Sequence, residues 1–73
     1  MKEKILEIIS QVTSLDIKDL EKNLEKENLW DSFTHIELIV NLESEFNISF
    51  EQDEIAALTT PQKVIDLVLK KVA

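Results

Sequence analysis

The chain has no glycine and one proline among its 73 residues, and both scarcities restrict the backbone. Hairpins and glycine-capped turns depend on these residue types, so a hairpin-rich β architecture is disfavoured. Cysteine is also absent, which excludes a disulfide framework and a thiolate zinc site and leaves the redox compartment undefined. Helices are therefore the expected building blocks.

Aromatic residues are also few, with three Phe, one Trp and no Tyr, so the core is expected to be mostly aliphatic. A chain of this length gives one small domain, residues 1–73, with a thin margin of stability. The N-terminus enters a charged amphipathic pattern rather than a long apolar run, so we expect neither a secretory signal nor a membrane span. We expect a soluble cytoplasmic protein that is monomeric.

Positive charge is missing from almost half of the chain. Between Glu27 and Gln62 there are eight acidic residues and no Lys or Arg, so this part carries the excess behind the net charge of −7. Phosphate binding requires clustered cations, which argues against nucleic acid and anionic lipid as partners. Two interpretations remain open: acidic faces that keep a small protein soluble, or a one-signed field that steers basic protein partners.

The hydrophobic pattern predicts an all-α fold, a small bundle of three main helices plus one short helix. The first helix is expected over Lys2–Thr13. A polar connection, Ser14–Trp30, follows with a short turn near Asp16–Leu20, and its regular leucines imply that it lies against the bundle. The second helix is expected from Asp31 to about Phe46. Asn47 can then take the left-handed conformation that ends a helix.

The last third of the chain predicts two more helices. Ser49 and Gln52 have the spacing of a capping box, which predicts the start of a short helix that continues through Leu58. Thr60 and Pro61 then predict the cap and first position of a final helix. Its buried stripe is expected to hold Val64, Ile65, Val68 and Val72. Residues 48–50 have strand character, but a single strand has no partner here.

The second helix carries two apolar stripes rather than one. The core-facing stripe is expected to hold Leu38, Ile39, Leu42 and Phe46, with His35 in the same sector. The second stripe adjoins Ser32, is flanked by Glu37 and Glu43, and consists of Phe33, Ile36 and Val40. Either the helix is central and buried on two sides, or the second stripe is an exposed docking face edged with carboxylates.

Asp31 and Ser32 open this helix, and the pair has two interpretations. Asp before a small residue is an ordinary helix cap. A serine beside an apolar strip in a cation-free segment is also well placed for modification by other proteins. We do not expect catalysis within the chain, because a dyad needs an oriented base and oxyanion donors that face a substrate in a cavity. This chain is short of room for such a pocket, has no glycine for a strained nucleophile turn, and places His35 toward the core. No metal site is expected either, since ligand clusters are missing.

Several segments together resemble one known family. They are Asp31-Ser32-Phe33-x-x-Ile36-Glu37-Leu38, Leu42-Glu43-x-Glu45-Phe46-Asn47-Ile48, Thr59-Thr60-Pro61 and Val64-Ile65-Asp66. The pattern resembles the acyl carrier proteins and their aminoacyl and peptidyl relatives over essentially the whole chain. The resemblance implies a helical carrier rather than an enzyme. It also implies that Ser32 receives 4'-phosphopantetheine from coenzyme A, and that the thiol of this arm carries an acyl or aminoacyl group as a thioester.

The resemblance also implies partners. These are a phosphopantetheinyl transferase, an acyl- or aminoacyl-adenylate-forming ligase and acyl-transferring enzymes, which would dock on the second helix through Phe33, Ile36, Glu37, Val40 and Glu43. Many fatty-acid carriers have Gly two residues before the Asp and Leu after the Ser, where this chain has Leu29 and Phe33. This version is closer to the D-alanyl and other specialised carriers. The alternative is a small acidic adaptor that uses the same face without a prosthetic group.

Overall fold

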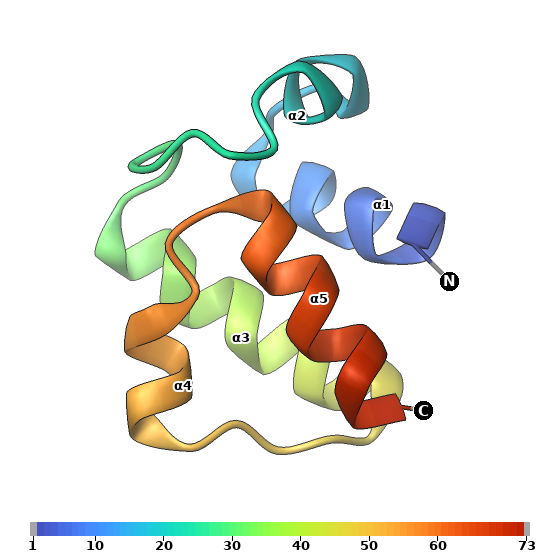
Figure 1. Ribbon diagram of the computed structural model, residues 1–73, viewed down its shortest axis with the longest axis vertical. Helices are drawn as coiled ribbons and strands as arrows, with labels where there is room; N and C mark the ends of the chain where they lie inside the picture. Colours follow the sequence, from blue (N-terminus) through green and yellow to red (C-terminus); the bar gives the residue numbers. More distant parts are fainter. Residues whose placement is uncertain (1, 73) are drawn as a thin grey trace.

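The computed structural model describes residues 2–72, which form five helices (Figure 1). They are α1 (Lys2–Thr13), α2 (Ile17–Lys22), α3 (Ser32–Phe46), α4 (Gln52–Ala57) and α5 (Pro61–Val72). No strand occurs within residues 2–72, and the segment 48–50 is extended but unpaired. The predicted all-α bundle with three long helices is confirmed. A second short helix, α2, stands where only a turn was expected.

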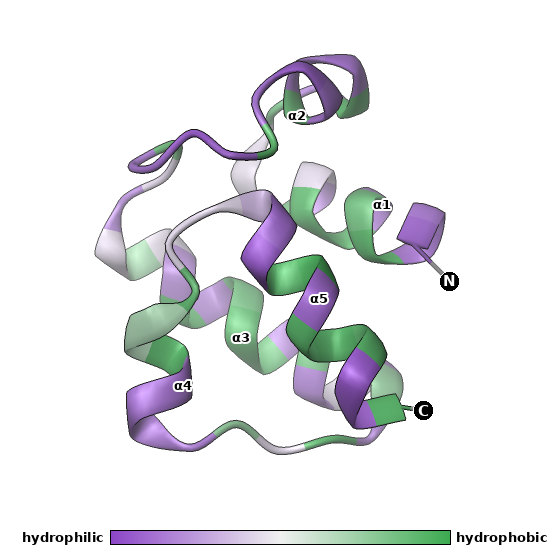
Figure 2. Cartoon of the chain, in the orientation of Figure 1, coloured by the Kyte–Doolittle hydropathy of each residue, from purple (hydrophilic) through white to green (hydrophobic). Residues whose placement is uncertain are grey.

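The three long helices enclose the core. α1 packs against α3, α5 and α2 (Figure 1). The hydrophobic sides of these helices turn toward one another and their hydrophilic sides turn outward (Figure 2). The buried hydrophobic residues are Ile5, Leu6, Ile8, Ile9, Leu20, Leu38, Ile39, Leu42, Phe50, Leu58, Val64, Ile65 and Val68. None of the helices described between residues 2 and 72 is long and apolar enough to cross a membrane.

The long connection between α1 and α3 lies against the bundle, as its leucines predicted. Leu20 of α2 is fully buried, and three further leucines pack against the core: Leu15, Leu24 and Leu29. The backbone N–H of Gln62 donates a hydrogen bond to the Leu24 carbonyl at 2.9 Å, which ties the connection to the start of α5. Ile17, the isoleucine of the same connection, differs from these leucines because it is 37% exposed.

Three residues adopt left-handed backbone conformations in place of glycine. Asn47 ends α3 with φ 54° and ψ 51°, and its N–H donates to the Glu43 carbonyl, as predicted. Ser14 and Asn28 have φ values of 64° and 62° and turn the chain after α1 and before α3. Asparagine tolerates this conformation better than most residues, because its short polar side chain can bond locally.

The predicted capping box of α4 is displaced by two residues. The N-cap is Glu51 rather than Ser49, and the Glu54 carboxylate accepts a hydrogen bond from the Glu51 N–H at 2.9 Å. Phe50 explains the difference, because its side chain is buried and its N–H donates to Glu43 Oε2 at 2.8 Å. The chain must stay extended through Phe50 to make both contacts, so the helix begins after it.

Candidate functional site

The first turn of α3 is capped by Asp31, as the sequence predicted. Asp31 Oδ1 accepts a hydrogen bond from the Thr34 N–H at 2.8 Å, and this bond lowers the pKa of the Asp31 carboxyl below its ordinary value. The carboxylate is therefore ionised at neutral pH while it satisfies one of the N–H groups that every helix start leaves without a helical acceptor.

Ser32 is the first residue of α3 and is exposed to solvent. Its position at the helix start places its hydroxyl near the remaining unpaired N–H groups and the positive end of the helix dipole. Both features favour a negatively charged substituent. The same turn thus offers an accessible hydroxyl and a setting that tolerates a phosphodiester.

A cleft of about 370 Å³ opens beside Ser32 between the start of α3, the preceding loop and α4. Its polar lining is Asn28, Asp31, Ser32, His35, Gln52 and Thr59, and its other lining residues are Leu29, Trp30, Ile36, Ile55, Ala56 and Leu58. This mixture of amide, hydroxyl and apolar side chains suits a ligand that combines hydrogen-bonding groups with alkyl segments. The sequence motif located the serine, but the cleft depends on α4, which lies 20 residues further along the chain.

His35 is half-buried beside this cleft, with both ring nitrogens in hydrogen bonds. The Trp30 indole N–H donates to His35 Nδ1 at 2.9 Å, and His35 Nε2 lies 2.8 Å from the Ile55 carbonyl oxygen. A ring bonded in this way has no free nitrogen for the Ser32 hydroxyl, so the geometry favours a structural His35 over a general base. Sequence reasoning missed this network, because no spacing rule links Trp30 or Ile55 to His35.

The second apolar stripe of α3 is exposed. The side chains of Phe33, Ile36 and Val40 are 75%, 55% and 57% exposed, which contradicts the alternative of a helix buried on two sides. Glu37 is also exposed on this helix. Glu43 differs from it, because its carboxylate is half-buried and turns to the Phe50 N–H. The exposed apolar strip, Phe33, Ile36 and Val40, therefore has one clear acidic neighbour in Glu37.

The cation-free segment is partly neutralised in space. Three of its acids meet lysines from outside the segment: Lys4 with Glu45 at 2.8 Å, Lys71 with Glu54 at 3.0 Å and Lys63 with Glu27 at 4.0 Å. The Lys4 bond raises the pKa of that ammonium. Within residues 2–72 the other acids of the segment form no ion pair with lysine, so uncompensated acidic charge remains near Ser32, at Asp31 and Glu37, and also at the start of α4, at Glu51 and Asp53.

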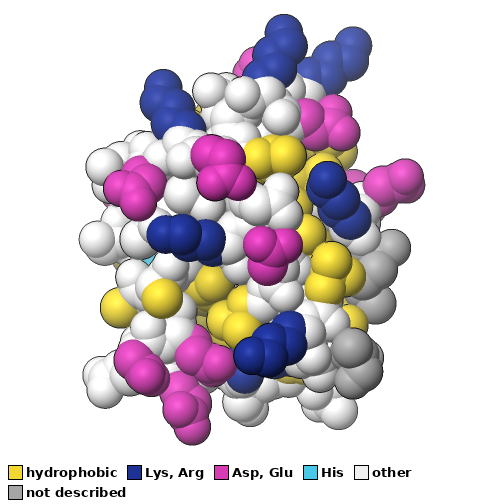
Figure 3. All heavy atoms as spheres, viewed as in Figure 1, with side chains coloured by type: hydrophobic (Ala, Val, Ile, Leu, Met, Phe, Trp, Pro, Cys, Tyr) yellow, Lys and Arg dark blue, Asp and Glu magenta, His cyan; other side chains and the backbone are white. Residues whose placement is uncertain are grey.

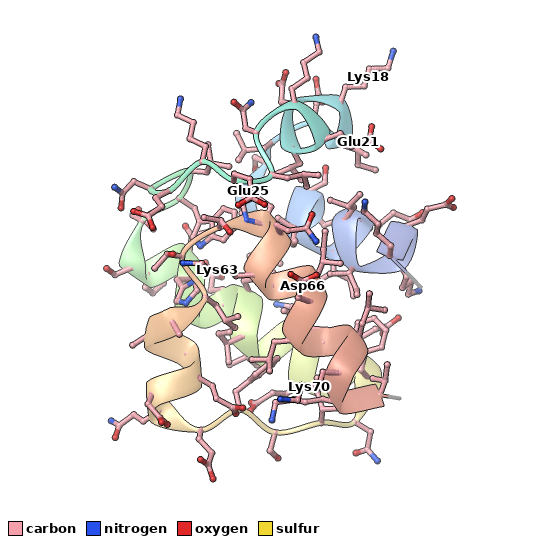
Figure 4. All side chains as sticks on the ribbon, in the orientation of Figure 1. Lys18, Glu21, Glu25, Lys63, Asp66 and Lys70 are labelled. Carbon is pink, nitrogen blue, oxygen red and sulfur yellow. The ribbon has the colours of Figure 1, made fainter. Side chains whose placement is uncertain are left out.

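The opposite pattern holds on the face that α2 and α5 share. Lys and acidic side chains are mixed across this face (Figure 3). Along α5, Figure 4 shows Lys63, Asp66 and Lys70, and α2 with the following connection carries Lys18, Glu21 and Glu25. This mixture creates no one-signed field. Among residues 2–72 there is also no group of three or more His, Cys, Asp or Glu side chains arranged to hold a metal ion.

Comparison with known proteins agrees with this geometry. The sequence model described as "Phosphopantetheine attachment site" matches residues 3–68. Two curated relatives, both called "D-alanyl carrier protein", come from Leuconostoc citreum and Leuconostoc mesenteroides subsp. mesenteroides. Each is 37% identical to this chain over 71 residues, which cover 89% of this chain and 87% of the relative. The chain therefore belongs to the phosphopantetheine attachment site family, and it is an acyl or aminoacyl carrier whose cofactor is covalently attached 4'-phosphopantetheine.

Proposed function

We propose that Ser32 is the residue that carries 4'-phosphopantetheine. The observation that carries the proposal is the position of its hydroxyl, which is exposed at the capped start of α3 and lines the cleft beside α4. Asp31 keeps the first turn in place, and the helix start stabilises the phosphodiester charge. When bound, the group supplies a thiol on a long flexible arm, which holds an acyl group as a thioester and presents it at a high effective concentration to docked enzymes.

The modification itself needs a partner enzyme. Ser32 Oγ forms a bond to phosphorus while the diphosphate bond of coenzyme A breaks, so the adenosine bisphosphate half leaves and the hydroxyl proton must be taken up. Both nitrogens of His35 are engaged with Trp30 and Ile55, so the base must come from the phosphopantetheinyl transferase. We accordingly propose that the chain catalyses no reaction of its own.

Intact mass measurement tests the attachment. Incubation with a phosphopantetheinyl transferase and coenzyme A should add the mass of one phosphopantetheinyl group to the wild-type protein and none to Ser32→Ala. Ser44→Ala is the matched control, because Ser44 is an exposed serine on the same helix, and it should be modified like the wild type. A wild-type protein that gains no mass would instead favour the adaptor without a prosthetic group.

We propose D-alanine as the cargo. The support is the likeness over nearly the whole chain to two proteins named as D-alanyl carriers. The acidic surface near Ser32 also suits a cargo with a free ammonium group, since Asp31 and Glu37 are not paired with lysine within residues 2–72. A D-alanine-adenylating ligase should charge the modified protein with D-alanine faster than with L-alanine or a fatty acid. Preferential loading of a fatty acid would contradict this assignment.

We propose that partner enzymes dock on the apolar strip formed by Phe33, Ile36 and Val40. Exposed apolar side chains edged by carboxylate are typical of the centre and rim of a protein interface. Glu37 is the acidic rim residue best placed to meet a basic partner, and Glu43 stays a weaker prediction because its carboxylate already binds the Phe50 N–H. The partner surface should therefore combine an apolar patch with Lys or Arg.

A further inference from the structure

Trp30, His35 and Ile55 form a hydrogen-bonded chain across the cleft beside Ser32. The planes of the indole and imidazole rings are nearly parallel, with an interplanar angle of 15° and 6.2 Å between the ring centroids. The Trp30 Nε1–H donates a hydrogen bond to His35 Nδ1 at 2.9 Å, which links the two rings directly. The other side of the imidazole reaches α4 at the Ile55 carbonyl.

These contacts define the protonation state of the imidazole. An indole nitrogen can only donate, so His35 Nδ1 must accept and carries no proton. A carbonyl oxygen can only accept, so His35 Nε2 must carry the proton and donate to Ile55. The network thus requires the neutral Nε2–H tautomer. A protonated imidazolium, or the Nδ1–H tautomer, would set two donors against each other at Trp30.

Ser32 lies between the two residues that make the first of these bonds. Trp30 precedes it by two residues in the loop, His35 follows it by three in α3, and Ile55 belongs to the facing helix α4; all four line the same cleft. The imidazole therefore connects the loop, α3 and α4 around the serine. Without the His35 bond, the indole would be held only by its packing against the hydrophobic core.

Few charged groups face the imidazole. From the loop, Asp31 is the other titratable side chain that lines the cleft, and it is engaged with the Thr34 N–H. On α4 and at its N-cap, Glu51, Asp53 and Glu54 are not among the lining residues, and Glu54 pairs with Lys71 of α5. Neither Glu37 of α3 nor any lysine lines the cleft.

We propose that His35 is a positioning residue for the arm on Ser32: as the neutral Nε2–H tautomer it fixes Trp30 and α4 on either side of the cleft beside the attachment point. The proposal rests on the proposed function, in that Ser32 is taken as the attachment site. Protonation removes the acceptor for the indole N–H, so acidification loosens the cleft and slows the modification of Ser32.

Nitrogen NMR of the apo-protein tests the network directly, because the chain has one histidine and one tryptophan. The imidazole should show the Nε2–H tautomer in the folded protein, and on acidification the indole N–H signal should shift together with the Ile55 region when the imidazole nitrogen signals report protonation. An Nδ1–H tautomer, or an indole signal that does not follow the imidazole titration, would overturn the proposal.

Variants then test the positioning role. A glutamine side chain can accept from the indole and donate to the Ile55 carbonyl without titrating, whereas leucine can do neither. We expect His35→Leu to lower kcat/KM for transfer to Ser32 by roughly threefold to tenfold, and His35→Gln to restore most of this loss. The ratio of the wild-type kcat/KM to the His35→Gln kcat/KM should fall on acidification. Taking this ratio removes the pH dependence of the transferase itself, because the same enzyme acts on both proteins. Thermal unfolding of each variant verifies that it is folded.

The outcomes separate this proposal from the proposed function. Equal rates for wild type, His35→Leu and His35→Gln across the pH range would contradict the positioning role alone. A wild-type protein that shows the Nε2–H tautomer but gains no phosphopantetheinyl group would contradict the attachment at Ser32.

Discussion

Asp31 is the residue on which the geometry of the attachment turn depends most directly. Its carboxylate accepts the Thr34 N–H at 2.8 Å and thereby satisfies a helix-start donor next to Ser32. Asp16 occupies the equivalent N-cap position of α2 but makes no side-chain capping bond. The two aspartates therefore form a natural comparison between a bonded and an unbonded cap.

We predict that Asp31→Ala lowers the melting temperature by several degrees at neutral pH, because the first turn of α3 loses its cap. Asp16→Ala should have a clearly smaller effect. Thermal unfolding followed by circular dichroism measures both variants. Equal effects of the two substitutions would show that the Thr34 bond adds no stability.

The Asp31 cap should also respond to pH with a defined sign. Its hydrogen bond from the Thr34 backbone lowers the pKa of the Asp31 carboxyl from the ordinary value of 3.8, so folding favours the ionised form. The stabilisation is present above pH 3.8 and is lost as the pH falls through the lower value of the folded state. The stability difference between wild type and Asp31→Ala should therefore shrink in acid. A difference that grows on acidification would contradict this assignment.

At the scale of the element, α3 divides its apolar residues between the core and solvent. Leu38, Ile39 and Leu42 are buried, whereas Phe33, Ile36 and Val40 are exposed. A helix that exposes three large apolar side chains beside its N-terminal serine is best explained by a partner that covers them. We propose that the carboxylate of Glu37 speeds the arrival of a basic partner and that the apolar strip slows its departure.

We predict that Glu37→Lys slows transfer to Ser32 by roughly threefold to tenfold at low salt, because it places a like charge against a basic partner. The melting temperature should change little. The matched control is Glu21→Lys, an equal charge change at an exposed site on α2 (Figure 4). Initial rates at several salt concentrations measure the effect. Equal rates for the two variants would argue against electrostatic docking at α3.

Much of this element-level organisation is predictable from the sequence because its signals are local. Asp31 as a cap, Asn47 as a left-handed stop and the buried stripe of α5 at Val64, Ile65 and Val68 each depend on neighbours within a few residues. Glu43 shows where local reasoning ends. The position of Glu43 beside the exposed strip suggested a docking role. In the structure the Glu43 carboxylate instead accepts a hydrogen bond from the backbone N–H of the buried Phe50 at 2.8 Å.

Contacts between distant segments account for the features that the sequence did not predict. The cleft beside Ser32 needs Gln52 and Thr59 to lie opposite the start of α3, and the His35 network needs the Ile55 carbonyl at hydrogen-bonding distance. Both the cleft and the network arise from the packing of α4. This helix begins two residues later than the sequence predicted, because Phe50 enters the core. Motif spacing can identify the serine, but the shape of its surroundings is a tertiary property.

At the scale of the whole molecule, the core is small, so each buried side chain contributes a large share of the free energy of unfolding. We predict that Leu42→Ala, at a fully buried position of α3, lowers the free energy of unfolding by about 2–5 kcal/mol. Val40→Ala, two residues away and 57% exposed, should cost less than about 0.5 kcal/mol. Urea denaturation gives both values. A large loss for Val40→Ala would mean that the apolar strip supports the fold rather than a partner.

The whole molecule combines a compact helical scaffold with an exposed serine, Ser32, at the capped start of α3, where Asp31 and Glu37 form no ion pair with lysine within residues 2–72. Lysines from α1 and α5 pair with three acids of the cation-free segment, Glu27, Glu45 and Glu54. The negative charges of Asp31 and Glu37 near Ser32 lie at the N-cap of α3 and on α3, the helix that carries the apolar strip. We therefore propose that attachment and docking use adjoining surfaces. A partner enzyme could then bind α3 and act on the group carried by the arm at the same time.

The most direct test of this account is to locate the added group by fragmentation mass spectrometry of the wild-type protein after reaction with a phosphopantetheinyl transferase and coenzyme A. The account predicts one phosphopantetheinyl group, on the peptide that contains Ser32 and on that residue alone. A group found on Ser44, Ser49 or another side chain would contradict the central claim that the start of α3 is the attachment point.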